Sequence, residues 1–321
     1  MSRPVRYARL PTEQPHPRSR SLDRLSVSQI LRLMNREDAT VPRAVARVMP
    51  SIAEAVALIV ERLRHGGRLF FVGAGTSGRL GVLEAAECPP TFHTPPSLVQ
   101  AIIAGGRGAV FRSREGAEDN RRAARQAIRR RVRRGDVVVG IAASGVTPFV
   151  DAALVAARAQ RATTMLLTCH PRAHARSHVD LLIAPCVGPE VIAGSTRLKA
   201  GTATKLILNM LTVSTMVRLG KIYGPWMVDV RPTSRKLHAR ARRIVQELAQ
   251  VLPRKAVTLL RRSRGQVKPA IVMGLLKTDY RRAQRLLAHH EGRLRPILES
   301  QNSKVKRQKR TDVSKDFPFE F

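Results

Sequence analysis

Apolar residues recur at spacings of three and four over the first part of the chain, a pattern typical of amphipathic helices. Residues 26–38 (SVSQILRLMNRED) and 41–63 follow it, and the second segment ends at His65-Gly66-Gly67. Pro50 should kink or break that second helix, because proline lacks the amide hydrogen that a helix interior requires. Residues 1–25 are rich in proline and arginine and predict an extended arm.

From residue 68 onward the pattern changes to short apolar runs that alternate with helical segments. The runs predict five strands, at 68–72, 97–104, 136–141, 162–168 and 179–184. Helices are expected between them, and a long apolar helix is expected at 201–219. This alternation predicts an α/β fold in which a five-stranded parallel sheet is sandwiched by helices.

The pattern after residue 234 is helical throughout, with short segments at 254–262, 267–276 and 280–287. The predicted organisation is therefore an N-terminal arm, an α/β domain, a small all-helical domain and a tail. Their expected bounds are 1–25, 26–233, 234–300 and 301–321. The tail opens with QNSKVKRQKR and is expected to be disordered.

The turn after the first expected strand, residues 73–78 (GAGTSG), fits the G-x-G-x-x-G pattern of dinucleotide-binding sites. The acidic residue that such a site needs after the next strand is missing, because residues 103–106 read IAGG. Thr76 and Ser77 add hydroxyl groups to the backbone amides at a helix N-terminus, which suits one phosphate monoester. We therefore expect Gly75, Thr76 and Ser77 to bind a phosphate group rather than a nucleotide.

A second turn of the same kind, residues 142–148 (AASGVTP), follows the third expected strand. If the strand order is 2-1-3-4-5, as in flavodoxin-like sheets, the two turns meet at the switch point where such sheets bind ligands. Ser144, Gly145 and Thr147 are then candidate substrate ligands. The alternative is that both are ordinary turns whose Ser and Thr cap the following helices.

A third stretch, residues 188–202, places small, hydroxyl and charged residues just before the long apolar helix. It could be a capped helix start, or it could close over a ligand. On the second interpretation Glu190, Ser195, Thr196 and Lys199 are further candidate substrate ligands.

The formal net charge of +35 is the abnormal bulk property of the chain, and arginines are densest at 121–134. Such a charge favours non-specific contact with nucleic acid or other acidic surfaces. Aromatic residues make up only 4% of the chain, so few rings are available to stack on bases. A solvated basic surface is the simpler interpretation, and weak non-specific contact with nucleic acid is the alternative.

Several classes of site and location are disfavoured by the sequence. The chain has three cysteines without a C-x-x-C pair, no apolar run long enough to span a membrane, and no apolar segment in its basic start. These features predict a reduced, cytoplasmic protein that makes no membrane contact. His170, His174 and His178 have helical spacing, but Pro171 and two neighbouring arginines argue against a metal site.

Five runs together carry a resemblance to a known family. They are TEQPHPRSRSLDRLS near the start, FVGAGTSGRLGVLEAAECPPTF, REGAED, DVVVGIAASG and GPEVIAGSTRLKAGTATKLILNM. Over about residues 10–300 the chain resembles the N-acetylmuramic acid 6-phosphate etherases, a bacterial family of the sugar-isomerase-domain superfamily. The resemblance implies a homodimer that binds a phosphorylated amino sugar without a cofactor. It also implies cleavage of the lactyl ether to N-acetylglucosamine 6-phosphate and D-lactate.

Cleaving that ether by elimination requires a base for the C2 proton and an acid for the ether oxygen at C3. Pro89-Pro90 should end the helix that contains Glu87, and the negative end of the helix dipole would then favour a protonated carboxyl, as an acid requires. An acidic group at the start of the basic helix would be favoured as the anion, as a base requires. From the residues alone the choice among Glu115, Glu118 and Asp119 stays open.

The resemblance places the two catalytic glutamates of the family at Glu87, the proton donor, and Glu118, its partner. The chain departs from the family pattern at Val146, where arginine is usual, and at His16 and His170, where asparagine is usual. An alternative function is a non-catalytic sugar-phosphate-binding regulator, since the glucokinase regulatory protein belongs to the same superfamily. Retention of both glutamates weighs against that alternative.

Overall fold

The computed structural model describes residues 10–171, 173 and 179–300. The chain forms two compact units, the first made of Met1–Pro89 and Thr94–Thr215, the second of Pro90–His93 and Met216–Phe321. The division falls at residue 215, earlier in the chain than the expected boundary at 233. The expected tail at 301–321 lies outside the described residues.

The first unit contains a parallel sheet of five strands in the order β2-β1-β3-β4-β5, as the sequence predicted. The strands are β1 (Leu69–Gly73), β2 (Val99–Ile103), β3 (Val137–Ile141), β4 (Thr163–Leu167) and β5 (Leu181–Ile183). In the register of β1, Gly73 lies beside Ile103 of β2 and beside Ile141 of β3. The chain therefore leaves β1 and β3 at the same edge of the sheet, side by side.

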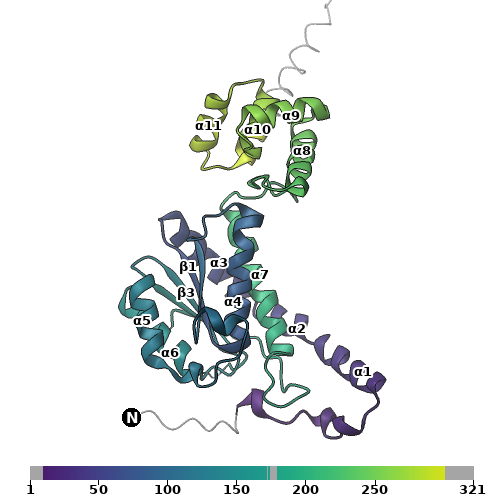
Figure 1. Ribbon diagram of the computed structural model, residues 1–321, viewed down its shortest axis with the longest axis vertical. Coiled ribbons are helices and arrows are strands. Elements are labelled where there is room, and N and C mark those ends of the chain that lie inside the picture. Colours follow the sequence, from purple (N-terminus) through teal and green to yellow (C-terminus); the bar gives the residue numbers. More distant parts are fainter. Residues whose placement is uncertain (1–9, 172, 174–178, 301–321) are drawn as a thin grey trace, which may run out of the picture. The chain divides into compact units, whose positions relative to one another are not determined.

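Helices cover both faces of this sheet (Figure 1). One face carries α5 (Arg121–Arg131) and α6 (Pro148–Ala159), and the other carries α4 (Gly75–Phe92) and α7 (Lys199–Arg218). The helix α3 (Met49–Arg64) contacts β5. Burial on both faces explains why the strands read as continuous apolar runs rather than alternating ones.

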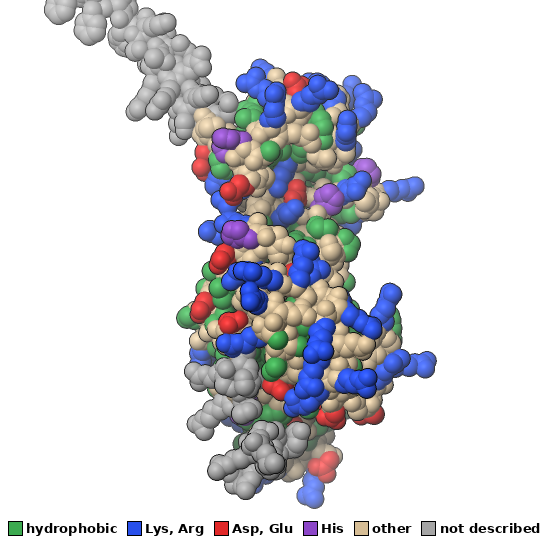
Figure 2. Space-filling view, turned by 90° about the vertical axis from the view of Figure 1, so that its left-hand side faces the viewer, with side chains coloured by type: hydrophobic (Ala, Val, Ile, Leu, Met, Phe, Trp, Pro, Cys, Tyr) green, Lys and Arg blue, Asp and Glu red, His purple; other side chains and the backbone are tan. Residues whose placement is uncertain are grey.

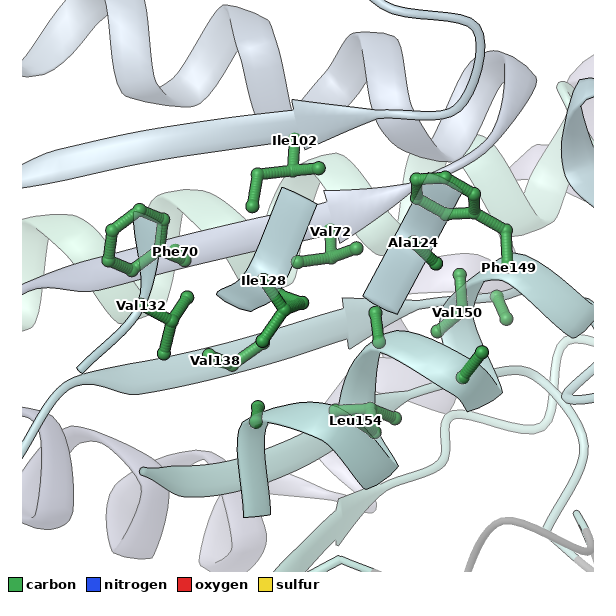
Figure 3. Close-up of a cluster of buried hydrophobic side chains, with 14 of the residues drawn as sticks. Phe70, Val72, Ile102, Ala124, Ile128, Val132, Val138, Phe149, Val150 and Leu154 are labelled. Carbon is green, nitrogen blue, oxygen red and sulfur yellow. The ribbon is translucent and has the colours of Figure 1, made fainter. Parts of the chain in front are cut away.

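Apolar side chains of the strands pack against α5 and α6 in the core between the sheet and these helices (Figure 3). Phe70 and Val72 of β1 and Val138 of β3 point to this face, where they meet Ile128 of α5 and Leu154 of α6. All five side chains are buried. The alternate residue Phe71 points to the other face, where a Cβ added at Gly81 of α4 would lie 2.9 Å from the Cβ of Phe71. A glycine at this position lets α4 lie close to the sheet.

Two expectations about the N-terminal region have different outcomes. The predicted break at Pro50 is confirmed, because α2 (Val41–Ala46) ends before it and Pro50 lies in the first turn of α3. The extended arm expected over 1–25 stays a prediction: the described residues from 10 onward form three 3-10 turns, at Pro11–Glu13, Pro17–Ser19 and Leu22–Arg24. They are followed by α1 (Val27–Asp38), which a Ser26 and Gln29 capping box opens.

The expectation that Pro89-Pro90 ends the helix after β1 is also wrong, because α4 continues to Phe92. The two prolines remove the amides that would bond to the carbonyl oxygens of Ala85 and Ala86. Ala86 is exposed, so water can reach this part of the helix. Glu87 therefore lies more than one turn before the end of α4, and the dipole argument for its protonation does not apply.

The second unit is helical, as the sequence predicted for this region. Its helices are α8 (Arg235–Ala249), α9 (Pro253–Arg262), α10 (Val267–Leu276) and α11 (Tyr280–His289). α10 is apolar and almost fully buried, and the apolar sides of α8, α9 and α11 pack around it. Among the described residues, no helix combines the length and the apolar character needed to cross a bilayer.

Candidate functional site

The turn after β1 brings backbone and hydroxyl groups to the first turn of α4. Gly75 has a positive φ of 52°, and Thr76 and Ser77 are half-buried at the helix N-terminus. A Cβ at Gly78 would lie 2.7 Å from the carbonyl oxygen of Gly73, so only glycine allows this close turn. The sequence pattern therefore has a steric cause that holds the amides and hydroxyls of the turn in place.

The turn after β3 is also held by a glycine. Gly145 has a φ of 73°, and a Cβ there would lie 2.6 Å from the Cβ of Ala173. The hydroxyl of Ser144 accepts a hydrogen bond from the amide of Val146 at 3.4 Å. Thr147 is the N-cap residue of α6, yet its side chain makes no capping hydrogen bond. The capping interpretation therefore does not account for Thr147.

These two turns lie next to each other because β1 and β3 are paired in register, with Gly73 beside Ile141. The third stretch reaches the same place. A Cβ added at Gly201, near the start of α7, would lie 3.8 Å from the methyl carbon of Thr76 and 3.6 Å from the carbonyl oxygen of Thr196. Ser195 and Thr196 are half-buried in the turn that leads into α7. Hydroxyl groups from three segments thus gather at the carboxyl edge of the sheet.

Glu190 and Lys199, two of the predicted substrate ligands, have partners within the chain. The buried carboxylate of Glu190 accepts hydrogen bonds from the amides of Lys199 at 3.0 Å and Ala200 at 2.9 Å, and so caps α7. Burial raises the pKa of Glu190, although these amides and the ammonium of Lys199 oppose the shift. Their role as substrate ligands stays a prediction, as it does for the hydroxyl residues.

A buried network that the sequence did not indicate fixes the start of α7. The ammonium of Lys199 lies 2.9 Å from a carboxylate oxygen of Glu37 on α1, and Nε2 of His16 lies 3.0 Å from the same oxygen. Nδ1 of His16 accepts a hydrogen bond from the amide of Arg18, so Nε2 donates to Glu37. Burial would raise the pKa of Glu37, but Lys199 and His16 hold it below its ordinary value. The three residues connect the N-terminal segment, α1 and α7.

Glu118 lies at the same edge of the sheet as the turns. It belongs to a 3-10 turn, Ala117–Asp119, that contacts α6 and ends just before Asn120 caps α5. The neighbouring Ala117 lines a small cavity with Gly105, which follows β2, and Phe149, which lies in the first turn of α6. Glu118 itself is exposed.

Glu87 lies elsewhere in the same chain. α4 returns antiparallel to β1, and Glu87 comes roughly 16 Å along the helix axis after Thr76, at a rise of about 1.5 Å per residue. The strands are roughly as long, at about 3.3 Å per residue. Glu87 is therefore near the amino edge of the sheet, exposed, on the far side from Glu118 and the turns. One chain does not bring the two predicted catalytic carboxylates together.

The histidine series does not form a site in the described part of the chain. Nδ1 of His170 lies 3.2 Å from the carbonyl oxygen of Ser144, and His174 and His178 lie outside the described residues. Within residues 10–171, 173 and 179–300, no group of three His, Cys, Asp or Glu side chains is arranged to hold a metal ion.

Known proteins resemble this chain in sequence and in fold. A family model described as the glucokinase regulatory protein N-terminal SIS domain matches residues 51–158. An N-acetylmuramic acid 6-phosphate etherase of Gloeothece citriformis is 51% identical over 90% of this chain and 95% of its own length. One of Salinibacter ruber is 52% identical over 90% of this chain and 94% of its own length. Among solved structures, a phosphoheptose isomerase from Neisseria gonorrhoeae matches with a TM-score of 0.47 and 18% identity, covering 59% of this chain and 98% of that one.

The buried pair of Glu37 and Lys199 predicts a pH-dependent stability. Because the pKa of Glu37 is lowered by folding, the pair stabilises the protein fully above the ordinary value of 4.5 and loses its contribution as the pH falls through the lower, folded value. Replacement by Glu37→Gln leaves a buried ammonium without a carboxylate and should cost about 3 kcal/mol near neutral pH. Thermal unfolding between about pH 7 and pH 3 should show wild type and variant converging at the acid end. A constant difference across this range, or no difference from the exposed control Glu54→Gln, would contradict the assignment.

Proposed function

The chain belongs to the N-acetylmuramic acid 6-phosphate etherases, and from this premise we propose that it cleaves the D-lactyl ether of N-acetylmuramic acid 6-phosphate. The products are N-acetylglucosamine 6-phosphate and D-lactate. The observation that carries the proposal is the identity of about half of all residues over nine tenths of the chain to named etherases. The gathering of hydroxyl-bearing turns at the switch point of the sheet supports it.

Within the domain expected over 26–233, we assign the phosphate group of the substrate to two turns. They are the turn after β1 (residues 73–78) and the turn after β3 (residues 142–148). Backbone amides at the start of α4 carry partial positive charge, and the hydroxyls of Thr76 and Ser77 stand beside them. The turn that contains Ser144 and Thr147 is adjacent to this one, across the β1–β3 pair. Val146 supplies no cation here, so hydrogen bonds and the helix N-terminus hold the phosphate.

The reaction balances as an elimination followed by an addition. In the ring-opened sugar the C1 aldehyde makes the C2 proton acidic, and a carboxylate removes it. The electron pair of that C–H bond forms a double bond between C2 and C3, and the ether oxygen leaves C3 with a proton from a carboxylic acid. Water then adds its hydroxyl at C3 and returns a proton to C2. The protein must therefore hold one ionised and one protonated carboxyl at adjacent carbons.

Glu118 is proposed as the base and Glu87 as the acid. Glu118 lies in the 3-10 turn that ends just before the N-terminus of α5. Glu87 is exposed in one chain, and Leu83, one turn earlier on α4, lies on the same side of the helix and is 42% exposed. A partner surface that covers this face would exclude water and favour the uncharged carboxyl.

The partner surface is proposed to be a second copy of this chain. Val27, Ile30, Leu31 and Met34 form one side of α1 at helical spacing, and Val27 and Leu31 are 73% and 61% exposed. Val213 of α7 is also exposed. The preceding residue, Thr212, donates a hydrogen bond to Glu84, so α7 and α4 are adjacent here. Apolar stripes of this kind are covered in stable assemblies. A symmetric dimer could place Glu87 of one copy beside Glu118 and the turns of the other.

Removal of either carboxylate should strongly reduce D-lactate release. Glu87→Gln and Glu118→Gln should each lower turnover by at least about 100-fold, because a positioned acid or base contributes a factor of that size or more. The matched controls Glu115→Gln and Asp119→Asn should retain turnover within about threefold of wild type. D-Lactate release is measured from N-acetylmuramic acid 6-phosphate under saturating conditions. A wild-type protein that binds N-acetylglucosamine 6-phosphate but releases no D-lactate would support the regulatory alternative instead.

Mixing the two inactive variants tests whether the site is shared between copies. After joint unfolding and refolding of equal amounts, half of the dimers are mixed, and each mixed dimer has one intact pair of carboxylates. Activity should therefore return to about a quarter of the wild-type level. Each variant refolded alone should stay inactive. If both carboxylates act from one chain, the mixture will show no recovery.

A second interaction, with polyanions, is favoured by the surface of α5. Arg122, Arg125 and Arg129 are exposed at helical spacing and form no ion pair within the described part of the chain. By contrast, Arg121 pairs with Asp151. Figure 2 shows that Lys and Arg side chains are spread over the visible face rather than confined to one patch. We propose weak contact with nucleic acid through α5, driven by counterion release.

This contact should weaken steeply with salt. The slope of log affinity against log salt should be shallower by about 2 to 3 in the variant Arg122→Gln/Arg125→Gln/Arg129→Gln, because each phosphate that an arginine neutralises contributes about 0.9 to the slope. The control Arg254→Gln/Arg281→Gln/Arg285→Gln removes the same charge from the second unit. Fluorescence anisotropy of a labelled DNA duplex measures both. Equal slopes in the two variants, or an affinity that does not change with salt, would rule out a role for α5.

A further inference from the structure

The second unit contains an open cavity of about 790 Å³. The segment 219–231 forms one part of its lining, the turn between α9 and α10 a second, and α11 with the following turn a third. Every lining residue belongs to the second unit. Its volume lies within the range of about 300–1,000 Å³ that is usual for small-molecule sites.

The wall of this cavity carries more positive than negative charge. Asp229 accepts contacts from two ammonium groups, Lys221 at 2.6 Å and Lys268 at 3.2 Å. Two cations share one carboxylate, so one positive charge is not neutralised. Lys268 is only 7% exposed, which makes that excess costly without a further anion. Burial, reinforced by Lys221 and opposed by Asp229, lowers the pKa of Lys268.

Two arginines add to the same wall. Arg231 and Arg264 line the cavity, and neither forms an ion pair within the described residues. Glu291, which also lines it, pairs with Arg293 outside the lining. The lining thus holds four Lys or Arg side chains against two carboxylates, one of which is already paired elsewhere. A small anionic ligand would offset this excess of positive charge.

The first turn of α10 provides hydrogen-bond donors for such a ligand. Gln266, Val267 and Lys268 line the cavity, and the N-cap residue Gln266 makes no side-chain hydrogen bond to the helix. The amides of Val267 and Lys268 are therefore not satisfied by a capping side chain, and they lie at the positive end of the helix dipole. The next residue, Pro269, has no amide hydrogen, and the amide of Ala270 bonds to the carbonyl oxygen of Gln266. Gln284 of α11 also lines the cavity and could bond to hydroxyl groups of a larger ligand.

We propose that this cavity binds a phosphate-bearing anion. Lys221, Lys268 and Arg231 would neutralise the phosphate, and the amides at the start of α10 would donate to its oxygens. The lining of this cavity belongs to the second unit, whereas the phosphate-binding turns of the proposed etherase site belong to the first. A phosphorylated sugar and free phosphate share this chemistry, and the unit would respond to one of them independently of turnover.

The proposal is tested with the full chain and labelled inorganic phosphate in equilibrium dialysis. The variant Lys221→Met/Arg231→Met removes the excess charge but leaves Asp229 paired with Lys268, so no buried charge loses its partner. We expect the wild type to bind one more phosphate per chain than this variant, or to bind that phosphate at least about 10-fold more tightly. Circular dichroism and the melting temperature report whether the variant is folded.

The matched control is Lys255→Met/Arg281→Met, which removes two exposed cations of the second unit that do not line the cavity. It should bind phosphate as the wild type does. Repeating the titration with N-acetylglucosamine 6-phosphate separates the two sources: tighter binding than inorganic phosphate at this site identifies a sugar phosphate, and equal binding identifies free phosphate. Unchanged binding in Lys221→Met/Arg231→Met, or equal loss in the control, would overturn the proposal. Loss of D-lactate release alone would not bear on it.

Discussion

The pairing of β1 with β3 is the constraint on which the candidate site depends. With Gly73 beside Ile141, both strands end at one level, and the chain must turn twice at adjacent points to reach α4 and α6. Glycines at 78 and 145 allow these turns, because a Cβ at either position would collide with neighbouring atoms. A slip of this register by one residue would separate the turns and move every strand side chain to the opposite face. One backbone arrangement therefore sets the core and the site together.

Buried charged groups position the segment before α7, which does not belong to the sheet. Glu190 caps α7, and Lys199 in the first turn of that helix reaches Glu37 of α1 and, through it, His16. The third segment is thus held at the site from two directions. Isolated, each of these charges would be costly to bury, but each is matched by an opposite charge or by backbone amides. Removing one partner would leave the others unsatisfied. The position of this segment therefore depends on all of these contacts together.

The sequence was sufficient where the physical cause was local. Short apolar runs predicted the strands, and Pro50 predicted the break before α3. Local rules failed at Pro89-Pro90, where α4 continues because its carbonyl groups can reach water. They also could not reveal the contact of Glu37 with Lys199, which joins residues 162 positions apart and leaves no periodic pattern. Glu118 was placed by resemblance, because three neighbouring acids fit the same helix start equally well.

Buried and exposed charged side chains have different roles in this chain. The most buried ionised side chains are matched, as Asp136 is with Arg68 and Glu84 is with Lys205. The excess of +35 is therefore carried largely by exposed side chains, where water and salt screen it. Such exposed charges attract any anion weakly and do not discriminate between anions. Selective binding of a phosphate requires cations or amides that are held by packing and partly removed from water. Overall basicity and selective anion binding therefore have different physical origins, and only the second depends on a fold that holds the binding groups in place.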